Sequence, residues 1–236
     1  NFIMKRTNKD AGIQLPEMRA KTNTILWKNK EEHDLAEDIH SMLQFSMVTK
    51  SQVDNLINYL ANGHLAMMVR ARQACVYPKL MKEHIKQLMK SGVIEDNPTF
   101  LAACDQSSKI DAIITLILSR KDNKRNKLIF CHYRGEIDII AERLKEAKLN
   151  VQTFDGRTKH KDRNEILTNS NLDVLILQIQ TGCEGLNLQH FNEVYFASPH
   201  WNPAVEDQAV ARCHRIGQES EVDVFRFEMG GFEEND

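Results

Sequence analysis

Three long polar side chains recur at fixed spacing in the segment "WNPAVEDQAVARCHRIGQ" near the end of the chain. Arg212 and Arg215 are three residues apart, and Gln208 precedes the first of them by four residues. In a helix, residues at i, i+4 and i+7 share one narrow face. Guanidinium groups stay charged at any working pH, and their forked N–H groups match the oxygens of phosphate. This spacing therefore suits a ligand that carries phosphate groups.

Residues at both ends of this segment predict where such a helix begins and ends. Asn202 is a favourable N-cap, Pro203 is a favourable first helical residue, and Gly217 is typical of the position just beyond a helix. We therefore expect one helix that ends just before Gly217. Its apolar side chains would dock on a sheet, and these are Val205, Ala209, Cys213 and Ile216. From the spacing alone, a solvated face on which the arginines pair with Glu206 or Asp207 is the favoured alternative.

Two nearby loops could contribute to the same site. "QTGCEGLNL" places Gly182 and Gly185 after an apolar run, and glycines there permit positive φ and close approach of the backbone to a ligand. Taken alone, an ordinary turn after a strand explains this loop equally well. "FDGRTKHKDR" places Gly156 and Thr158 before a basic helix start, where N–H groups and a hydroxyl can bind phosphate. An Asp-Gly turn followed by solvated charges is an equal alternative.

The region from residue 106 to residue 236 alternates between apolar strands and amphipathic helices. Strands are expected at 128–133, 150–154, 172–179, 192–198 and 222–227, and helices at 107–121, 135–148, 159–170 and 203–216. This alternation predicts an α/β fold, with a parallel sheet covered by helices on both faces. Ligands of such sheets bind beyond the carboxyl ends of the strands. The loops at those ends read "HYRG", "DGRTKHK", "QTGCEGLN" and "SPHWNP".

The region from residue 1 to residue 105 has a different pattern. A short strand is expected at 22–29, and helices are expected at 30–47, 51–60, 64–75 and 79–90, the last stopping at Gly92. Their methionine-rich faces are best explained by packing, because Met fills irregular gaps. We therefore expect a helical region over 1–105 and a separate α/β domain over 106–236.

Composition limits the classes of function. Charged residues make up 27% of the 236 residues with a formal net charge of −2, so any contact with nucleic acid must use local features. The five cysteines show no C-x-x-C pair and no Cys/His metal spacing, which favours reduced intracellular thiols and no metal site. No apolar run reaches eighteen residues, so no membrane segment is expected. The start at Asn1 and the end at "EEND" suggest a piece of a longer protein.

Several segments together resemble the Snf2-type ATPases, a branch of the superfamily 2 helicase-like motors. The eighteen residues from Trp201 to Gln218 resemble motif VI and the segment before it, almost without a break. In chain order, "KLIFCHYRGEIDIIAERL" resembles motif IV, "VQTFDGRTKHKDR" motif IVa, and "VLILQIQTGCEGLNL" motif V. "FIMKRTNKDAGIQLP" resembles the segment that opens the family's second half, and "RARQACVYPKLM" a helical segment between the lobes. Motif V departs from the family pattern at Cys183 and Glu184, and His200 stands where the family often has a first tryptophan.

The resemblance implies an ATP-driven translocase on double-stranded DNA that works inside the cell, in the nucleus or at another site of DNA transactions. Motors of this kind bind ATP between two RecA-like lobes. The first lobe supplies the phosphate loop and the acidic pair that binds Mg²⁺. This sequence contains no Gly-Lys and no Asp-Glu dipeptide, so it resembles only the second RecA-like lobe with the Snf2 helical insertion. We therefore expect the first lobe to be a partner within the same protein, and this chain alone not to hydrolyse ATP.

The resemblance also implies a role for particular residues. Arg212 and Arg215 would reach the γ-phosphate, with Arg215 as the arginine finger, and Gln208 would position the γ-phosphate or the attacking water. Gly185 and Asn187 would line the nucleotide. The residues expected to contact the DNA backbone or minor groove are Gly156, Thr158, Gln180, Thr181 and Trp201.

Three interpretations of function remain in competition. The first is the C-terminal half of a chromatin remodeller, a repair or fork-remodelling translocase, or a viral transcription ATPase. The second is a non-catalytic DNA- or protein-binding module derived from such a lobe. The third is an RNA helicase of the same superfamily, against which the Trp-Asn-Pro and Arg-Ile-Gly-Gln sequences argue.

Overall fold

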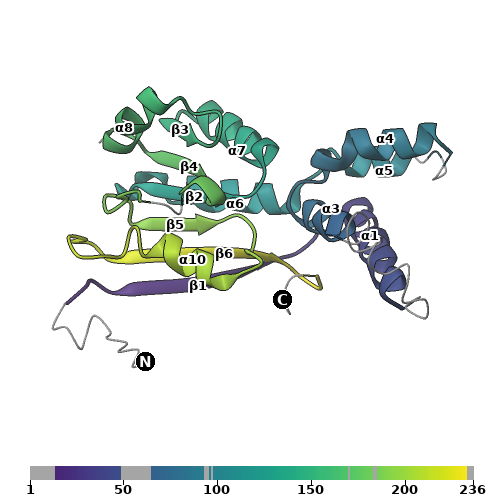
Figure 1. Ribbon diagram of the computed structural model, residues 1–236, viewed down its shortest axis with the longest axis horizontal. Coiled ribbons are helices and arrows are strands. Elements are labelled where there is room, and N and C mark those ends of the chain that lie inside the picture. Colours follow the sequence, from purple (N-terminus) through teal and green to yellow (C-terminus); the bar gives the residue numbers. More distant parts are fainter. Residues whose placement is uncertain are drawn as a thin grey trace, which may run out of the picture. The chain divides into compact units, whose positions relative to one another are not determined.

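A six-stranded parallel sheet is formed mainly by the second half of the chain (Figure 1). The computed structural model describes residues 14–48, 65–92, 96, 98–169, 171–182 and 185–232, so the predicted helix at 51–60 lies outside it. The strand order is β1-β6-β5-β2-β4-β3. The strands are β1 (Met18–Ile25), β2 (Lys127–Cys131), β3 (Val151–Phe154), β4 (Val174–Gln178), β5 (Glu193–Phe196) and β6 (Val222–Met229).

All neighbouring strands run in the same direction. The pairs β2/β4, β2/β5, β3/β4 and β5/β6 are parallel. At the edge, the N–H of Val222 donates to the carbonyl of Glu17, and the N–H of Gly230 donates to that of Ile25, so the offset along β1 and β6 is constant. The predicted parallel sheet is therefore confirmed. The strand predicted at 22–29 begins earlier, at Met18, and ends at Ile25, because its pairing with β6 starts next to Glu17.

Helices cover the two faces of this sheet. They are α6 (Ser108–Ser119), α7 (Arg134–Glu146), α8 (His160–Thr168), the short α9 (Ile179–Gly182) and α10 (Pro203–Val210). Alternate strand residues, among them Leu128, Leu175 and Val194, form one core cluster with Ile166 of α8 and Ala209 of α10. Helix α7 packs on β2, β3 and β4 without joining this cluster, so it covers the opposite face. The predicted α/β fold with helices on both faces is thereby confirmed.

A buried ionic cluster joins the amino ends of β2 and β5. The carboxylate of Glu193, the first residue of β5, is fully buried. It accepts hydrogen bonds from Arg120 Nε at 2.8 Å, Asn123 Nδ2 at 2.7 Å and Tyr195 Oη at 2.7 Å. The ammonium of Lys127, at the start of β2, lies 3.6 Å away. A buried charge with this many partners fixes the starting points of the two strands.

The remaining helices form a smaller core. They are α1 (Lys30–Val48), α3 (Leu65–Val76), the 3-10 turn η2 (Pro78–Met81), α4 (Lys82–Lys90) and α5 (Pro98–Ala103), which the sequence did not predict. Leu35 of α1, Ala74 of α3, Met81 and Ile85 pack together in this core. Among the described helices, none is long and apolar enough to span a membrane. The four described cysteines are buried and free of disulfides.

The chain divides into two compact units. One comprises Asn1–Asn23 and Ile114–Phe227, and the other comprises Thr24–Ile113 and Glu228–Asp236. The division thus falls inside α6, and the N-terminal segment groups with the sheet. The predicted domain boundary between residues 105 and 106 stays a prediction.

Candidate functional site

Helix α10 begins where the sequence predicted and ends earlier. The side chain of Asn202 accepts the N–H of Ala204 at 3.0 Å, and Pro203 is the first helical residue. The helix ends at Val210, and the chain continues in turns as far as Gly217. Arg212 and Arg215 therefore lie beyond the helix, and the prediction that they share a helical face with Gln208 is wrong. Ile216 is also not docked, since 65% of it is exposed.

The turn from Ala211 to Gln218, which we call the arginine turn, is shaped by tertiary hydrogen bonds. The carbonyl of Arg212 accepts the N–H of Leu188 at 3.2 Å. The buried amide of Gln218 donates to the carbonyl of Gln189 at 2.7 Å and to that of Cys213 at 3.2 Å. The carbonyls of Arg212 and Cys213 would otherwise accept N–H groups of a continuing helix. Their bonds to Leu188 and Gln218 hold the chain in turns beyond Val210.

Gly217 allows the arginine turn to close. Its φ is +97°, a conformation that residues with a Cβ rarely adopt. Gln189 Nε2 donates to the carbonyl of Ile216 next to it. A Cβ atom built on Gly217 would lie 2.9 Å from that same nitrogen. The backbone angle therefore favours glycine at this position, and a Cβ would also displace the end of the Gln189 side chain.

The two residues predicted to line the nucleotide, Gly185 and Asn187, directly precede the residues that bind the arginine turn. Gly185 has a φ of +69°, and it lines a pocket of about 650 Å³ together with Asn187. The other residues that line this pocket are Asn126, Asn164, Leu167, Thr168, Leu186 and His190. The next residues along the chain, Leu188 and Gln189, bind the arginine turn. The structure thus links Gly185 and Asn187 to the arginines through the backbone, although neither arginine lines the pocket.

The charges on α10 do not form the surface pairing that the spacing favours. Glu206 is buried, and its Oε2 accepts Arg226 Nε at 2.7 Å while its Oε1 accepts the N–H of His200 at 2.9 Å. Both of its oxygens are therefore engaged by residues of β6 and of the loop after β5. The side chains of Arg215 and Gln208 are exposed, and among the described residues Arg215 has no carboxylate partner.

The predicted DNA residues follow the carboxyl ends of three strands. After β3, the hydroxyl of Thr158 accepts the N–H of Asp155 at 3.0 Å, which closes the loop around Gly156. Arg157 donates to Asp155 and Asp138, and its guanidinium holds the pKa of the Asp155 carboxyl below its usual value despite partial burial. The loop is thus a tightly bonded Asp-Gly turn, as the alternative explanation supposed.

Arg134 is a residue that the sequence analysis did not single out. It is the exposed first residue of α7, just after the loop that follows β2, and its Nη2 lies 3.2 Å from where a Cβ of Gly156 would be. A glycine at 156 therefore leaves room for an exposed guanidinium between two strand ends. The segment "HYRG" could have marked Arg134 as a candidate, because a cation near a strand end of a parallel sheet is well placed for an anionic ligand.

The loop after β5 presents an aromatic side chain to solvent. Ser198 Oγ lies 3.0 Å from His132 Nδ1, and the rings of His132 and His200 stack with centroids 5.2 Å apart. The backbone of His200 is also bonded to Glu206. Trp201 follows directly and is 50% exposed. The loop is therefore fixed on both sides of an accessible tryptophan.

Gln180 and Thr181 lie in α9, directly after the carboxyl end of β4. Gln180 is exposed and Thr181 is half-buried. Gln178, the last residue of β4, donates to the carbonyl of His132 at 3.2 Å and so ties the ends of β4 and β2 together. These contacts bring the residues that follow β2, β4 and β5 to one edge of the sheet.

The predicted site residues thus form two groups at different places on the lobe. The DNA group follows the carboxyl ends of β3, β4 and β5. The arginine turn instead binds Leu188 and Gln189, and Gln218 also contacts the carbonyl of Phe191, just before the amino end of β5. Helix α10 connects the two groups, since it starts next to Trp201 and ends next to Ala211. Of the two groups, only the DNA group lies where ligands of parallel sheets usually bind, beyond the carboxyl ends of the strands.

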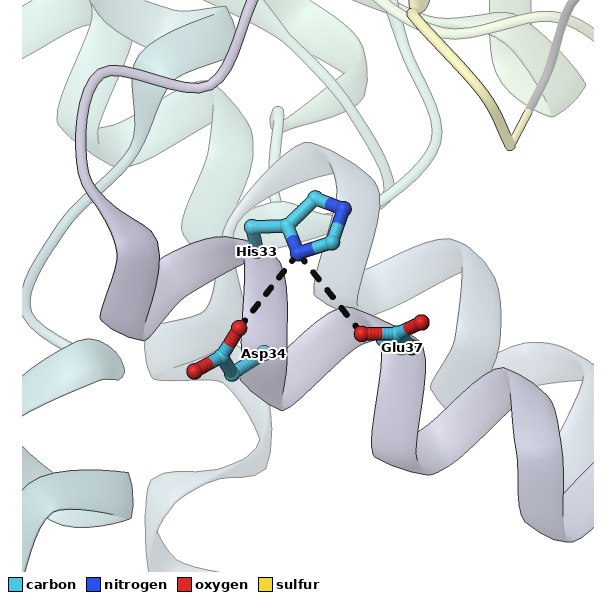
Figure 2. A group of neighbouring side chains, drawn as sticks. All are labelled: His33, Asp34 and Glu37. Atoms are coloured by element: carbon cyan, nitrogen blue, oxygen red, sulfur yellow. Dashed lines mark hydrogen bonds and ion pairs between the residues drawn. The ribbon is translucent and has the colours of Figure 1, made fainter.

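One group of side chains has the composition of a metal site. His33, Asp34 and Glu37 lie together on α1 (Figure 2), with His33 Nδ1 at 3.5 Å from Asp34 Oδ1 and 3.8 Å from Glu37 Oε2. Lys30 lies 3.6 Å from the other oxygen of Asp34, and the ring of His33 packs edge-on against Trp27. These side chains already have partners within the helical unit, and we assign them no metal.

Comparisons with known proteins identify a domain family within this chain. Residues 108–217 match the family described as helicase conserved C-terminal domain. An uncharacterised ATP-dependent helicase of Mycoplasma genitalium is 28% identical over 95% of this chain and 20% of its own length. DNA repair protein RAD5 of Debaryomyces hansenii is 37% identical over 52% of this chain and 11% of its own length. The chain thus spans a fifth or less of the length of these relatives.

A further relative and a solved structure extend the match over most of the chain. The DNA excision repair protein ERCC-6-like of Danio rerio is 24% identical over 94% of the chain and 16% of its own length. The crystal structure of the C-terminal part of the Fun30 ATPase domain superposes with a TM-score of 0.69, at 18% identity, over 93% of this chain and 87% of that one. The fold, the order of the motifs and these relatives agree: residues 108–217 form a helicase conserved C-terminal domain, and the chain as a whole is similar to the C-terminal, RecA-like lobe of the Snf2-type ATPases of superfamily 2.

Proposed function

We propose that this chain is the C-terminal half of an ATP-driven translocase on double-stranded DNA. The observation that carries the proposal is the separation of its site residues into two groups connected by α10. A motor must couple hydrolysis to movement on DNA, and a helix with one end in each group offers a direct mechanical connection. The relatives include an ATP-dependent helicase and DNA repair proteins, which supports both halves of this proposal.

In the proposed mechanism, ATP with Mg²⁺ is bound mainly by the first lobe of the same protein. Arg212 and Arg215 reach the γ-phosphate only when the two lobes close. ATP then favours the closed arrangement, because it makes contacts there that are absent in the open one. Arg215 acts as the finger that stabilises charge in the transition state, while Gln208 orients the γ-phosphate or the attacking water, and Gly185 and Asn187 line the nucleotide.

The carboxyl-end loops would hold the DNA. Exposed Trp201 offers a flat apolar surface, and Gln180, Thr181 and the Gly156–Thr158 turn offer polar groups to sugars and phosphates. Such contacts position a duplex without reading its sequence, as a translocase requires. The net charge of −2 supports contact through local features instead of a general basic field. The expected places of action are the nucleus or other sites of DNA transactions inside the cell.

Arg215→Ala tests the ATP half of the proposal in the full-length protein. We expect DNA-stimulated hydrolysis to fall by about 10³-fold or more, the effect typical of an arginine finger, with DNA binding largely retained. Lys145→Ala serves as the control, since it removes one exposed cation from α7, away from both groups. ATP turnover and duplex binding are measured for each variant. Unchanged turnover in Arg215→Ala would remove the finger assignment.

Trp201→Ala tests the DNA half. The stimulation of hydrolysis by duplex DNA should fall about tenfold, which is the loss of roughly 1–3 kcal/mol of aromatic contact, whereas basal hydrolysis should change little. Turnover is compared with double-stranded DNA, single-stranded DNA and RNA. Equal losses with and without DNA would show that Trp201 acts on folding, and strongest stimulation by RNA would favour the RNA helicase interpretation.

A further inference from the structure

His214 lies within the arginine turn and contacts a part of the chain that is distant in sequence. Its ring Nε2 is 2.8 Å from the carbonyl oxygen of Pro16. Its own N–H donates to the carbonyl of Val210 at 2.8 Å, so its backbone is held by the last turn of α10. The side chain is half-buried, and its neighbours at −2 and +1 are Arg212 and Arg215. His214 therefore connects the arginines to the segment that leads into β1.

The acceptor of this hydrogen bond is rigid. The ring of Pro16 fixes its own φ and restricts Leu15 to extended conformations. The next carbonyl, that of Glu17, accepts the N–H of Val222 at 3.0 Å, where the pairing of β1 with β6 begins. Because a carbonyl can only accept, Nε2 of His214 must donate, and both the Nε2–H neutral ring and the doubly protonated ring can do so. The contact is thus fixed at both ends and survives a change in protonation.

The other contacts of the arginine turn come from a different side. Leu188 and Gln189 lie between β4 and β5, and Gln218 bonds back to that same segment. Without His214, every hydrogen bond described here between the turn and other segments would go to that one connection. The turn could then pivot about it, and its exposed side chain, Arg215, would move farthest. The contact with Pro16 gives the turn a second point of attachment, on a different segment of the chain.

From these contacts we infer that His214 is a positioning residue for Arg215, acting through its hydrogen bond to Pro16. The inference rests on the proposed function, because it assigns Arg215 to the ATP site. It adds that the arginine finger is aligned by the chain entering the lobe as well as by motif V. A displacement of residues 14–17 would therefore shift the arginine turn and change the rate of hydrolysis.

The test uses three substitutions of His214 in the full-length protein. His214→Gln keeps an amide N–H at nearly the distance of Nε2, His214→Asn carries the same amide one methylene short, and His214→Leu removes the donor. We expect His214→Leu and His214→Asn to lower kcat for DNA-stimulated hydrolysis by about 10- to 100-fold, the range for misplacing a catalytic group by about 1 Å. The KM for ATP should change much less, and His214→Gln should recover most of the rate.

Controls separate positioning from folding. His84→Leu on α4 removes an exposed histidine from the helical unit and should leave kcat unchanged. Thermal unfolding of each variant gives its folded fraction at the assay temperature. In a double-mutant cycle, Pro16→Gly should lower kcat by a smaller factor, and it should add little to the loss already caused by His214→Leu.

The possible results are distinct. Equal losses in His214→Gln and His214→Leu, or losses that match a fall in the folded fraction, would overturn the positioning role. Full additivity of Pro16→Gly and His214→Leu would also overturn it, because the two changes would then act independently. Arg215→Ala is measured in parallel. If that variant keeps normal turnover, the proposed function itself fails, whereas a severe loss there with normal His214 variants refutes this inference alone.

Discussion

Gly217 determines the shape of the arginine turn more directly than the arginines do. Its positive φ reverses the chain, and the absence of a side chain leaves space for the amide of Gln189. The buried amide of Gln218 then closes the turn on the carbonyls of Cys213 and Gln189. The conformation of the arginine turn therefore depends on one backbone angle and a few amide hydrogen bonds.

Gly217→Ala should destabilise the lobe by more than about 1 kcal/mol, because left-handed strain and displacement of Gln189 add together. The comparison is Gly92→Ala, where φ is +70° but nothing lies within 4 Å of a new Cβ. Both variants carry backbone strain, and only Gly217→Ala has a steric conflict. Urea unfolding of the two variants measures the difference. Equal losses would show that the contact with Gln189 contributes nothing.

The sequence indicates candidate site residues, but not the contacts that hold them in place. Arg212, Arg215 and Trp201 stand out because their side chains suit phosphate and DNA. Gln218 and His214 appear in the same segment, yet their roles depend on the carbonyls of Gln189 and Pro16, which are distant in sequence. Spacing within one segment contains no information about such partners.

The sequence predicted strands and helix ends correctly where local patterns determine them, above all in fully buried strands. The strands β2, β4 and β5 are apolar runs buried on both faces, and such runs are hard to mistake when turns flank them. The start of α10 was also predictable, since Asn202 and Pro203 act locally. Its end at Val210 was not predictable, because helical spacing continues to Ile216 and tertiary hydrogen bonds override it.

Glu193→Gln tests the element-level role of the buried ionic cluster. Burial alone would raise the pKa of Glu193, but hydrogen bonds from Arg120 and Tyr195 and the charge of Lys127 outweigh it, so the pKa is lowered. The ionised carboxylate therefore stabilises the fold above the ordinary value of 4.5, and this contribution is lost as pH falls through the lower folded-state pKa. At neutral pH the variant should lose about 3–5 kcal/mol, since the buried ammonium of Lys127 then lacks its carboxylate partner.

The pH dependence separates this effect from a loss of packing. The gap in unfolding free energy between wild type and Glu193→Gln should narrow as pH falls below about 4.5, where the unfolded wild-type chain takes up a proton at Glu193, and should reach its low-pH limit below the lower folded-state pKa. Glu146→Gln, at the exposed end of α7, is the matched control and should change stability little at any pH. A gap that stays constant down to pH 3 would contradict the electrostatic explanation.

At the scale of the whole molecule, the proposed function makes this chain one lobe of a two-lobed motor. It forms two compact units and spans a fifth or less of the relatives described above. Arg215 is exposed and Arg212 is half-buried. Under the proposed function, the phosphate-binding half of the site lies on the first lobe, and hydrolysis requires the assembled protein.

The isolated chain should show no ATP hydrolysis with or without duplex DNA, because it lacks the phosphate loop and the acidic pair that binds Mg²⁺. It should still bind duplex DNA weakly, and the affinity should fall as salt rises, with a slope reflecting only a few phosphate contacts. Turnover by phosphate release and binding by fluorescence anisotropy measure both properties. DNA-stimulated turnover by the purified chain would contradict the proposal that it carries only half of the ATP site.

Helix α10 has 8 residues and so a length of about 12 Å. The loop after β5, which carries Trp201, lies at one end of it, and the arginine turn lies at the other. A short helix of this kind behaves as a rigid rod, so a shift of its first turn on binding DNA moves its last turn as well. Thermodynamic reciprocity then applies to the two ligands. Whatever factor DNA contributes to the affinity for ATP, ATP must contribute to the affinity for DNA, and a single substitution that bends α10 should weaken both effects equally.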